Sequence, residues 1–198
     1  LCEAISFIAQ KGWAPGTGGN FSVVVNESPL KLLLTKSGVD KHTVTPDELL
    51  LVNRSGKVIR GNAQPSAETL LHTAIARVTG AHCILHTHTA WNTVVSICEK
   101  GPQLKLTGFE MLKGLQGVKT HEHVEIVPVF ENSQDIPALA RKISARMRKQ
   151  PTMHGFLLRG LGLYTWGANV SEARRHVEIF EFLFEVYGRL NSNRALQS

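Results

Sequence analysis

The amino-acid sequence predicts an α/β protein with a largely antiparallel central sheet. Segments with apolar residues at helical spacing alternate with short apolar strands along all 198 residues. Turn residues between the early strands indicate hairpins, and hairpins are typical of antiparallel sheets rather than doubly wound parallel ones. No linker and no shift in composition divides the chain, so we expect a single domain over residues 1–198.

The N-terminal part should begin with a helix and continue with short strands. Residues 1–11 fit a helix that ends at Gly12, after which a glycine-rich loop follows. Strands are predicted at 21–25, 30–35, 49–53 and 58–59. A further helix is predicted over Ala67–Val78, where apolar residues recur at helical spacing, with its start near Pro65 and Ser66.

The C-terminal part continues the alternation. Its predicted elements are a strand ending in His86-Thr87-His88, a helix at 91–97, a strand at 124–130, a helix at 134–149 and a hairpin over 156–166. A final long helix should begin near Ser171 and end at Gly188, because glycine commonly follows the last turn of a helix.

Composition excludes several classes of protein. Hydrophobic residues make up 42% of the chain and charged residues 19%, which is typical of a globular protein. The net charge of +6 suits an anionic small substrate. We expect no nucleic acid partner, because the basic cluster Arg141–Lys149 lies on a helix face without interleaved aromatic residues. Apolar runs too short for a bilayer predict no membrane partner, and three cysteines without a disulfide spacing favour the cytoplasm.

His86-Thr87-His88 is the most informative single segment. Alternate side chains of a strand share a face, so both imidazoles should point the same way. Two neutral imidazoles on one rigid face can chelate a divalent metal such as zinc, although surface histidines at this spacing are also common. A second pair, His121 and His123, is interpreted as surface or supporting groups.

Two glycine-containing loops are candidates for binding an anion. Pro15–Asn20 lies between a helix and a strand, which reverses the order of the Rossmann and P-loop motifs and argues against nucleotide binding by those routes. Backbone N–H groups of this loop and of Thr35–Gly38 can still converge on a phosphate. Taken alone, each loop is equally consistent with a tight turn.

The order of these motifs resembles the class II aldolase/adducin family. Four segments carry the resemblance: Gly18-Gly19-Asn20, Thr35–Gly38, Pro65–Glu68 and His86–His88. Three later segments, at 109–113, 128–135 and 158–167, resemble the branch of the family that acts in methionine salvage. The resemblance extends from about Ala14 to Tyr187.

This resemblance implies a zinc-dependent hydro-lyase on an α/β/α sandwich, assembled as a homo-oligomer and commonly as a tetramer. The implied substrate is a phosphorylated ketose with a methylthio group, from which water is removed to give a diketo phosphate. The implied site residues are His86 and His88 for zinc, Glu110 and secondarily Glu68 for acid–base chemistry, and Gly18, Asn20, Ser37 and Gly38 for phosphate.

One position departs from the family pattern. The family places a third zinc-binding histidine between two glycines where this chain has Leu161, whose side chain cannot bind a metal. A catalytic zinc normally has three protein ligands, so we expect His86 and His88 to bind zinc weakly. His154 can replace the missing ligand only if the hairpin folds it back toward the pair.

Two alternative functions stay open from the sequence. An aldolase or epimerase of the same family, acting on another sugar phosphate, would use the same loops and histidines. A non-catalytic, metal-poor binding module of the adducin type would share the fold without the chemistry. Leu161 favours the binding module, whereas His86, His88 and Glu110 oppose it.

Overall fold

The computed structural model describes residues 1–195, in which helices and strands alternate much as the sequence predicts. The strands are β1 (Asn20–Glu27), β2 (Leu30–Thr35), β3 (Leu49–Asn53), β4 (Val58–Arg60), β5 (Cys83–Thr87), β6 (Gln103–Leu106), β7 (Glu125–Phe130), β8 (Gly155–Leu158) and β9 (Gly162–Gly167). The helices are α1 (Cys2–Gln10), α2 (Thr69–Thr79), α3 (Ala90–Cys98), α4 (Ile136–Lys149) and α5 (Val170–Ala195), with 3-10 turns η1 (Pro46–Glu48) and η2 (Glu110–Gly114).

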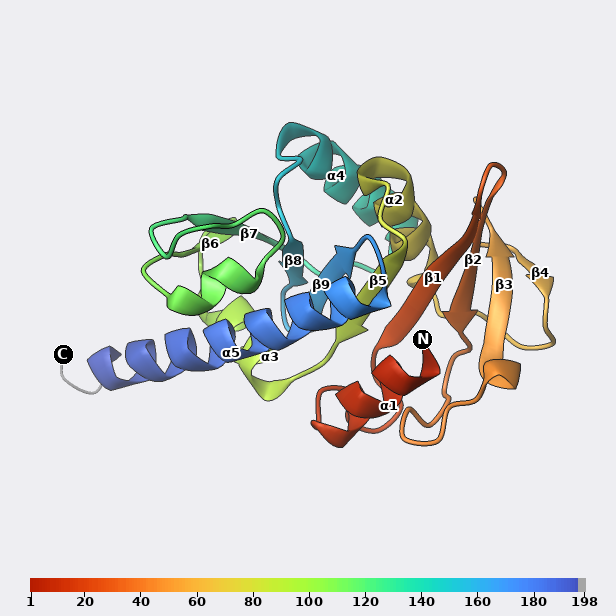
Figure 1. The fold of residues 1–198 in the computed structure, drawn as a ribbon, viewed down its shortest axis with the longest axis horizontal. Helices are drawn as coiled ribbons and strands as arrows, with labels where there is room; N and C mark the ends of the chain where they lie inside the picture. The colour runs from red at the N-terminus through yellow and green to blue at the C-terminus, as the bar shows by residue number, and fades with distance from the viewer. Residues whose placement is uncertain (196–198) are drawn as a thin grey trace.

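The nine strands form one sheet in the order β4-β3-β2-β1-β5-β9-β8-β7-β6 (Figure 1). Neighbouring strands pair antiparallel, except that β7 and β8 are parallel. The predicted α/β class and the largely antiparallel sheet are therefore confirmed. No helix within residues 1–195 combines the length and the apolar character needed to cross a membrane.

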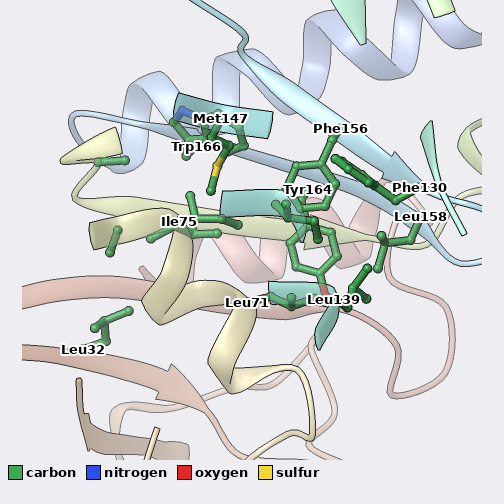
Figure 2. Close-up of a cluster of buried hydrophobic side chains, with 14 of the residues drawn as sticks. Leu32, Leu71, Ile75, Phe130, Leu139, Met147, Phe156, Leu158, Tyr164 and Trp166 are labelled. Carbon is green, nitrogen blue, oxygen red and sulfur yellow. The ribbon is translucent and has the colours of Figure 1, made fainter. Parts of the chain in front are cut away.

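Helices cover both faces of the sheet, which gives the α/β/α sandwich that the resemblance implies. On one face α2 and α4 pack together, and their apolar side chains meet the aromatic residues of β8 and β9 (Figure 2). On the other face α5 crosses β9 and β5 and contacts α1 and α3 (Figure 1). Burying a large apolar side chain in such layers contributes about 1.5–3 kcal/mol to folding.

β5 lies near the middle of the sheet and carries the first histidine of the pair. All of its residues, Cys83–Thr87, are buried, because layers of helices cover both faces. Its register places His86 opposite Asn20 on β1 and opposite Tyr164 on β9. The sheet thus brings together segments that lie far apart in the sequence.

Three features of the chain differ from those predicted. Helix α2 begins at Thr69 rather than near Pro65, because the Ser66 hydroxyl accepts the Glu68 N–H (3.2 Å) and forms a turn before the helix. Helix α5 continues through Gly188 to Ala195, so the prediction that Gly188 ends it is wrong. The short elements β6 and η2 are absent from the prediction.

Gly188 is needed inside α5 for packing rather than for ending the helix. A Cβ atom at this position would lie 2.7 Å from ring carbons of Trp91 on α3. That distance is shorter than non-bonded carbon atoms tolerate, so only glycine lets the Trp91 ring lie against the backbone of α5. The contact between α3 and α5, two helices far apart in the sequence, therefore requires a glycine at this position.

Candidate functional site

His86 and His88 point to the same side at the end of β5, as their spacing predicts. Their Nε2 atoms lie 2.8 Å apart, with ring centroids at 4.5 Å. The His86 Nδ1–H donates to the Leu163 carbonyl oxygen (2.8 Å), which leaves the Nε2 of a neutral His86 ring as an acceptor. His88 then donates its own Nε2–H to His86. The two Nε2 atoms therefore face each other.

The two rings are kept neutral by their surroundings. His86 is fully buried, and burial lowers its pKa to about 4. Burial also lowers the pKa of His88 to about 4, and the adjacent His86 adds to this effect. Both imidazoles are therefore uncharged at pH 7, which is the protonation state that can bind a metal.

An aromatic stack fixes the orientation of the His86 ring. Tyr164 lies parallel to it, with a centroid distance of 3.9 Å and an interplanar angle of 10°. Phe156 stacks on the other side of Tyr164 at 5.0 Å and 11°. The registers of β8, β9 and β5 place these three residues in a row across the sheet. Figure 2 shows Phe156 and Tyr164 within the same core.

The glycine-rich loop before β1 lies directly against the histidine pair. A Cβ atom on Gly19 would be 2.6 Å from the carbonyl oxygen of His86, and Gly19 also has a φ of +76°. At Gly18 a Cβ atom would contact the His88 ring at 3.5 Å. The backbone N–H of His88 donates to the Trp13 carbonyl oxygen (3.0 Å). The structure therefore places this loop beside the pair.

Asn20 is the centre of a buried polar network. Its amide nitrogen donates to the Ser66 hydroxyl (3.2 Å) and to the Glu68 carboxylate. Its amide oxygen accepts from His72 Nε2, and His72 Nδ1 accepts from the Ser22 hydroxyl (2.8 Å). Burial lowers the pKa of His72 to about 3, so this ring also stays neutral.

Through Asn20 the network orients Glu68 toward the histidines. One carboxylate oxygen of Glu68 lies 3.8 Å from the Nε2 atom of His86. Glu68 immediately precedes the first turn of α2, so the helix start fixes the position of its backbone. The second-ranked acid–base candidate is thus close to the proposed metal-binding atoms.

The loop after β2 lies close by and is joined to the glycine-rich loop by Lys41. The Ser37 N–H donates to the Gln64 carbonyl oxygen (3.3 Å), and Gly38 follows. Lys41 is almost completely buried, and its ammonium donates to the carbonyl oxygens of Thr17 and Val39, both at 2.9 Å. Burial lowers its pKa. Sequence reasoning missed Lys41, because a lysine in a loop is normally a solvated surface residue.

Glu110 is the candidate that the structure does not bring to the pair. It lies on η2 with its side chain 67% exposed, and it forms ion pairs with Lys113 and with His121 (3.8 Å). A hydrogen bond from Lys113 lowers the pKa of Glu110, so its carboxylate is ionised at neutral pH. Within the described residues it makes no hydrogen bond with His86 or His88.

Leu161 lies in the turn that abuts the histidine strand. Next to it, a Cβ atom on Gly162 would be 2.0 Å from the carbonyl oxygen of Thr87, so the turn and β5 are in direct contact. The Leu161 side chain is half-buried and packs against the apolar cluster between the sheet and the α2–α4 layer. An apolar side chain therefore occupies the position to which the resemblance assigns a third ligand.

His154 does not replace that ligand. Its two ring nitrogens are hydrogen-bonded to Glu125 and to the Gln116 carbonyl oxygen, away from the pair. Within residues 1–195 no group of three or more His, Cys, Asp or Glu side chains is arranged to hold a metal ion. The pair of histidines at the end of β5 thus supplies two donors.

Glu181 supports the histidine segment from α5, and sequence reasoning missed it as well. This carboxylate is 4% exposed and accepts hydrogen bonds from Thr87 (3.0 Å), Thr89 and Asn92 (3.0 Å). Thr87 lies between the two histidines, so Glu181 fixes the backbone that carries them. Burial raises the pKa of Glu181 to about 7, against the opposing effect of these donors.

The raised pKa of Glu181 predicts a pH-dependent stability. Folding raises this pKa from 4.5 to about 7, so the folded protein binds the proton more tightly and the free energy of unfolding should fall as pH rises through this range. Gln cannot ionise, so in Glu181→Gln the fall in the free energy of unfolding between pH 5 and 8 should be smaller than in wild type by on the order of 2 kcal/mol. Urea unfolding of both proteins at the two pH values measures the difference. Equal losses would show that Glu181 does not titrate in this range.

Comparison with known proteins places these residues in a family context. A family model of the class II aldolase and adducin N-terminal domain matches residues 1–188. Methylthioribulose-1-phosphate dehydratase from Yersinia enterocolitica is 45% identical over 186 residues, which cover 93% of this chain and 88% of the relative. The protein of the same name from Enterobacter sp. (strain 638) is 46% identical over 191 residues, covering 96% and 93%.

The fold is also that of solved class II aldolases. L-fuculose-1-phosphate aldolase from Thermus thermophilus matches with a TM-score of 0.76 at 25% sequence identity, over 98% of this chain and 93% of that chain. This likeness confirms the arrangement of the sheet and helices.

Proposed function

This chain belongs to the class II aldolase and adducin family, and we propose that within it the chain is a hydro-lyase acting on 5-methylthioribulose 1-phosphate, in methionine salvage. The reaction removes one water and yields 2,3-diketo-5-methylthiopentyl 1-phosphate. The observation that carries the proposal is the converging, neutral pair His86 and His88 beside the glycine-rich loop, in a chain similar over nine tenths of its length to dehydratases of that name.

We propose that His86 and His88 hold a zinc ion. The residues fit such an ion in chemistry: both rings are neutral, their Nε2 atoms lie 2.8 Å apart, and the Leu163 carbonyl oxygen leaves the Nε2 of His86 without a proton. His88 offers its Nε2 as well when its proton moves to Nδ1. When bound there, zinc supplies a Lewis acid for the ketone and the neighbouring hydroxyl oxygen of the substrate. Two protein donors instead of three make binding weak.

The proton transfers are assigned to carboxylates. Dehydration takes a proton from the carbon beside the ketone and a hydroxyl group from the next carbon, so a group must accept a proton and return it to the leaving oxygen. Glu110 takes this role by its match to the dehydrating branch of the family. Glu68, at 3.8 Å from His86, is the second candidate.

The phosphate group is assigned to the two loops beside the pair. The Gly18 and Ser37 N–H groups donate to the carbonyl oxygens of Pro15 and Gln64, so the proposal relies on the Gly38 backbone, the Ser37 hydroxyl and the buried ammonium of Lys41 beside them. The Asn20 side chain is occupied by Ser66, Glu68 and His72, so its part in the phosphate site is to hold the loop in place.

Ser37→Ala should raise KM several-fold with little change in kcat. A phosphate remote from the reacting carbons is held similarly in the ground state and the transition state, so its contacts affect binding more than turnover. Steady-state kinetics on the substrate measure the effect, with Ser55→Ala in the β3–β4 turn as a matched control. If inorganic phosphate does not compete with the substrate, the phosphate assignment is wrong.

Assembly and location are further parts of the proposal. We infer a homo-oligomer, a tetramer, from the resemblance to the family, and a cytoplasmic location from the three cysteines without a disulfide spacing. The phosphorylated ketose is the partner that the fold and the loops are suited to bind. Sedimentation equilibrium of the purified protein tests the tetramer.

Comparing substrates tests the function directly. Purified protein, with and without added zinc, is offered methylthioribulose 1-phosphate, fuculose 1-phosphate and a ribulose phosphate. Turnover of the first with release of one water per diketo product supports the proposal. Faster cleavage or epimerisation of another sugar phosphate would favour the aldolase alternative. No turnover of any substrate in a folded, zinc-supplemented sample would favour the adducin-like binding module.

A further inference from the structure

A second polar cluster surrounds Gln116 at the end of β9 opposite to the histidine pair. Gly162 at one end of β9 abuts the pair, whereas Trp166 and Gly167 at the other end line a cavity of about 470 Å³. Three histidines line the same cavity: His123, His154 and His176. None of them has a role in the function proposed above.

His154 is held in a geometry that requires a positive charge. Its Nδ1 lies 3.0 Å from a Glu125 carboxylate oxygen and its Nε2 lies 2.8 Å from the Gln116 carbonyl oxygen. Both partners only accept hydrogen bonds, so both ring nitrogens must carry protons. Burial alone would lower the pKa of His154, but the hydrogen bond and charge of Glu125 outweigh it and raise the pKa. Glu125, which is 2% exposed, forms the other half of a buried ion pair.

His176 is held in a geometry that requires a neutral ring. Its Nδ1–H donates to the Trp166 carbonyl oxygen (2.7 Å), and its Nε2 accepts the backbone N–H of Gln116 (3.1 Å). A ring nitrogen that accepts a hydrogen bond cannot carry a proton. Burial lowers the pKa of His176 to about 4, in agreement with this assignment.

His154 and His176 together bind the backbone N–H and the carbonyl oxygen of Gln116. His154 and His176 meet edge to face, with centroids 5.4 Å apart, and Gln116 lies against both. Gln116 follows η2 closely in the chain. The end of η2 is also tied to α5 by the Arg175 guanidinium, whose Nε donates to the Gly114 carbonyl oxygen (2.9 Å). Glu110 itself is exposed, so its place depends on the turn that carries it.

We propose that His154 and His176 are positioning residues, which hold Gln116 and thereby fix η2 and its Glu110 for the dehydration. This inference rests on the proposed function, because it assigns the positioned carboxylate its catalytic role. It concerns residues that act through η2 and do not touch the substrate. His123 offers a matched comparison, since it also bonds Glu125 (2.9 Å) but makes no hydrogen bond with Gln116 within the described residues.

A charged His154 and a neutral His176 can both bind Gln116 only within a limited pH range. The charged and titratable groups around His154 are Glu125 and His123 from β7 and the segment before it, and Glu172 and His176 from α5, while Arg175 acts on His176. Raising the pH above the pKa of His154 removes one of its two donors, and lowering the pH toward 4 protonates His176. The positioning should therefore weaken on the alkaline side above the ordinary histidine value of 6.5.

The test compares His154→Gln with His123→Gln. In His154→Gln, kcat should fall about 10-fold or more with KM within about two-fold, because displacing a catalytic group affects turnover more than binding. The alkaline decline of kcat should also shift. Hydrogen exchange over residues 108–118 should speed up in this variant and stay unchanged in His123→Gln. If His154→Gln is unstable because it leaves the Glu125 charge buried and unpaired, the double variant Glu125→Gln, His154→Gln replaces it in the test. The double variant should show the same fall in kcat and the same faster exchange.

The two readouts separate the failure of this inference from the failure of the function. Unchanged exchange over 108–118 in folded His154→Gln overturns the inference, and so does faster exchange with unchanged kcat. An inactive wild-type protein overturns the proposed dehydration. In that case the exchange comparison still decides whether the histidines hold η2.

Discussion

Glu110→Gln should lower kcat for methylthioribulose 1-phosphate by about 100-fold or more while the protein stays folded. Glutamine keeps the shape of the side chain but cannot take up and return a proton. The Glu110 side chain is 67% exposed, and its ion pairs with Lys113 and His121 lie at the surface, where such pairs contribute little to stability. Steady-state kinetics, with the thermal unfolding midpoint measured on the same sample, check both parts of the expectation.

Two further variants make the result specific. Glu122→Gln removes an exposed carboxylate from the same region and should leave kcat within about two-fold of wild type. Glu68→Gln tests the competing candidate, which lies 3.8 Å from His86 and accepts from Asn20. Near-normal turnover in Glu110→Gln, together with a large loss in Glu68→Gln, would transfer the acid–base role to Glu68.

The features predicted correctly from the sequence are those that a local pattern determines. Alternation on a strand places His86 and His88 on one face whatever the rest of the chain does, and the structure confirms this. The helical spacing of apolar residues likewise predicts α4, where Leu139, Ile143 and Met147 face the core. The hairpin pairs β1–β2 and β8–β9 likewise join strands that are close in sequence, whereas the antiparallel pairs β1–β5 and β5–β9 join distant segments.

The features that sequence reasoning missed depend on contacts between distant segments. Gly188 looks like a helix end by composition, but the ring of Trp91 makes a glycine necessary within the helix. In the sequence Glu181 looks like an ordinary helix residue. In the structure α5 packs against the histidine strand, and the Thr87 hydroxyl donates to Glu181. The same holds for Lys41, whose acceptors belong to two different loops. Such hydrogen bonds leave no periodic signal in a sequence.

A local signal is present for β6 but is short. Leu104 and Leu106 are buried while Lys105 is exposed, the alternation expected of a strand, yet it covers only the four residues Gln103–Leu106. A segment of that length gains its stability from pairing with β7 rather than from its own pattern. The histidine pair could be predicted more completely than the residues that support it, because the pair forms a short sequence motif and the supporting residues do not.

Leu161→His should tighten zinc binding by on the order of 10-fold or more and raise the dehydratase activity with it. The turn that carries Leu161 contacts the histidine strand through Gly162 and Thr87, so an imidazole at this position is expected to reach the side on which the Nε2 atoms of His86 and His88 converge. A third imidazole completes the ligand number that catalytic zinc sites usually have. Zinc titration of metal-free wild type and variant, with activity measured on the same samples, checks both effects.

The competing outcome is loss of stability, because Leu161 is half-buried against the apolar cluster and a polar ring there loses hydration. Leu161→Gln is the matched control: it is polar and similar in size but supplies no imidazole. If destabilisation alone determines the result, both variants should lower the unfolding midpoint equally and neither should gain zinc affinity. If Leu161→His stays folded and binds zinc no more tightly than wild type, Leu161 does not face the histidine pair, and the correspondence of this turn with the family's third ligand is wrong.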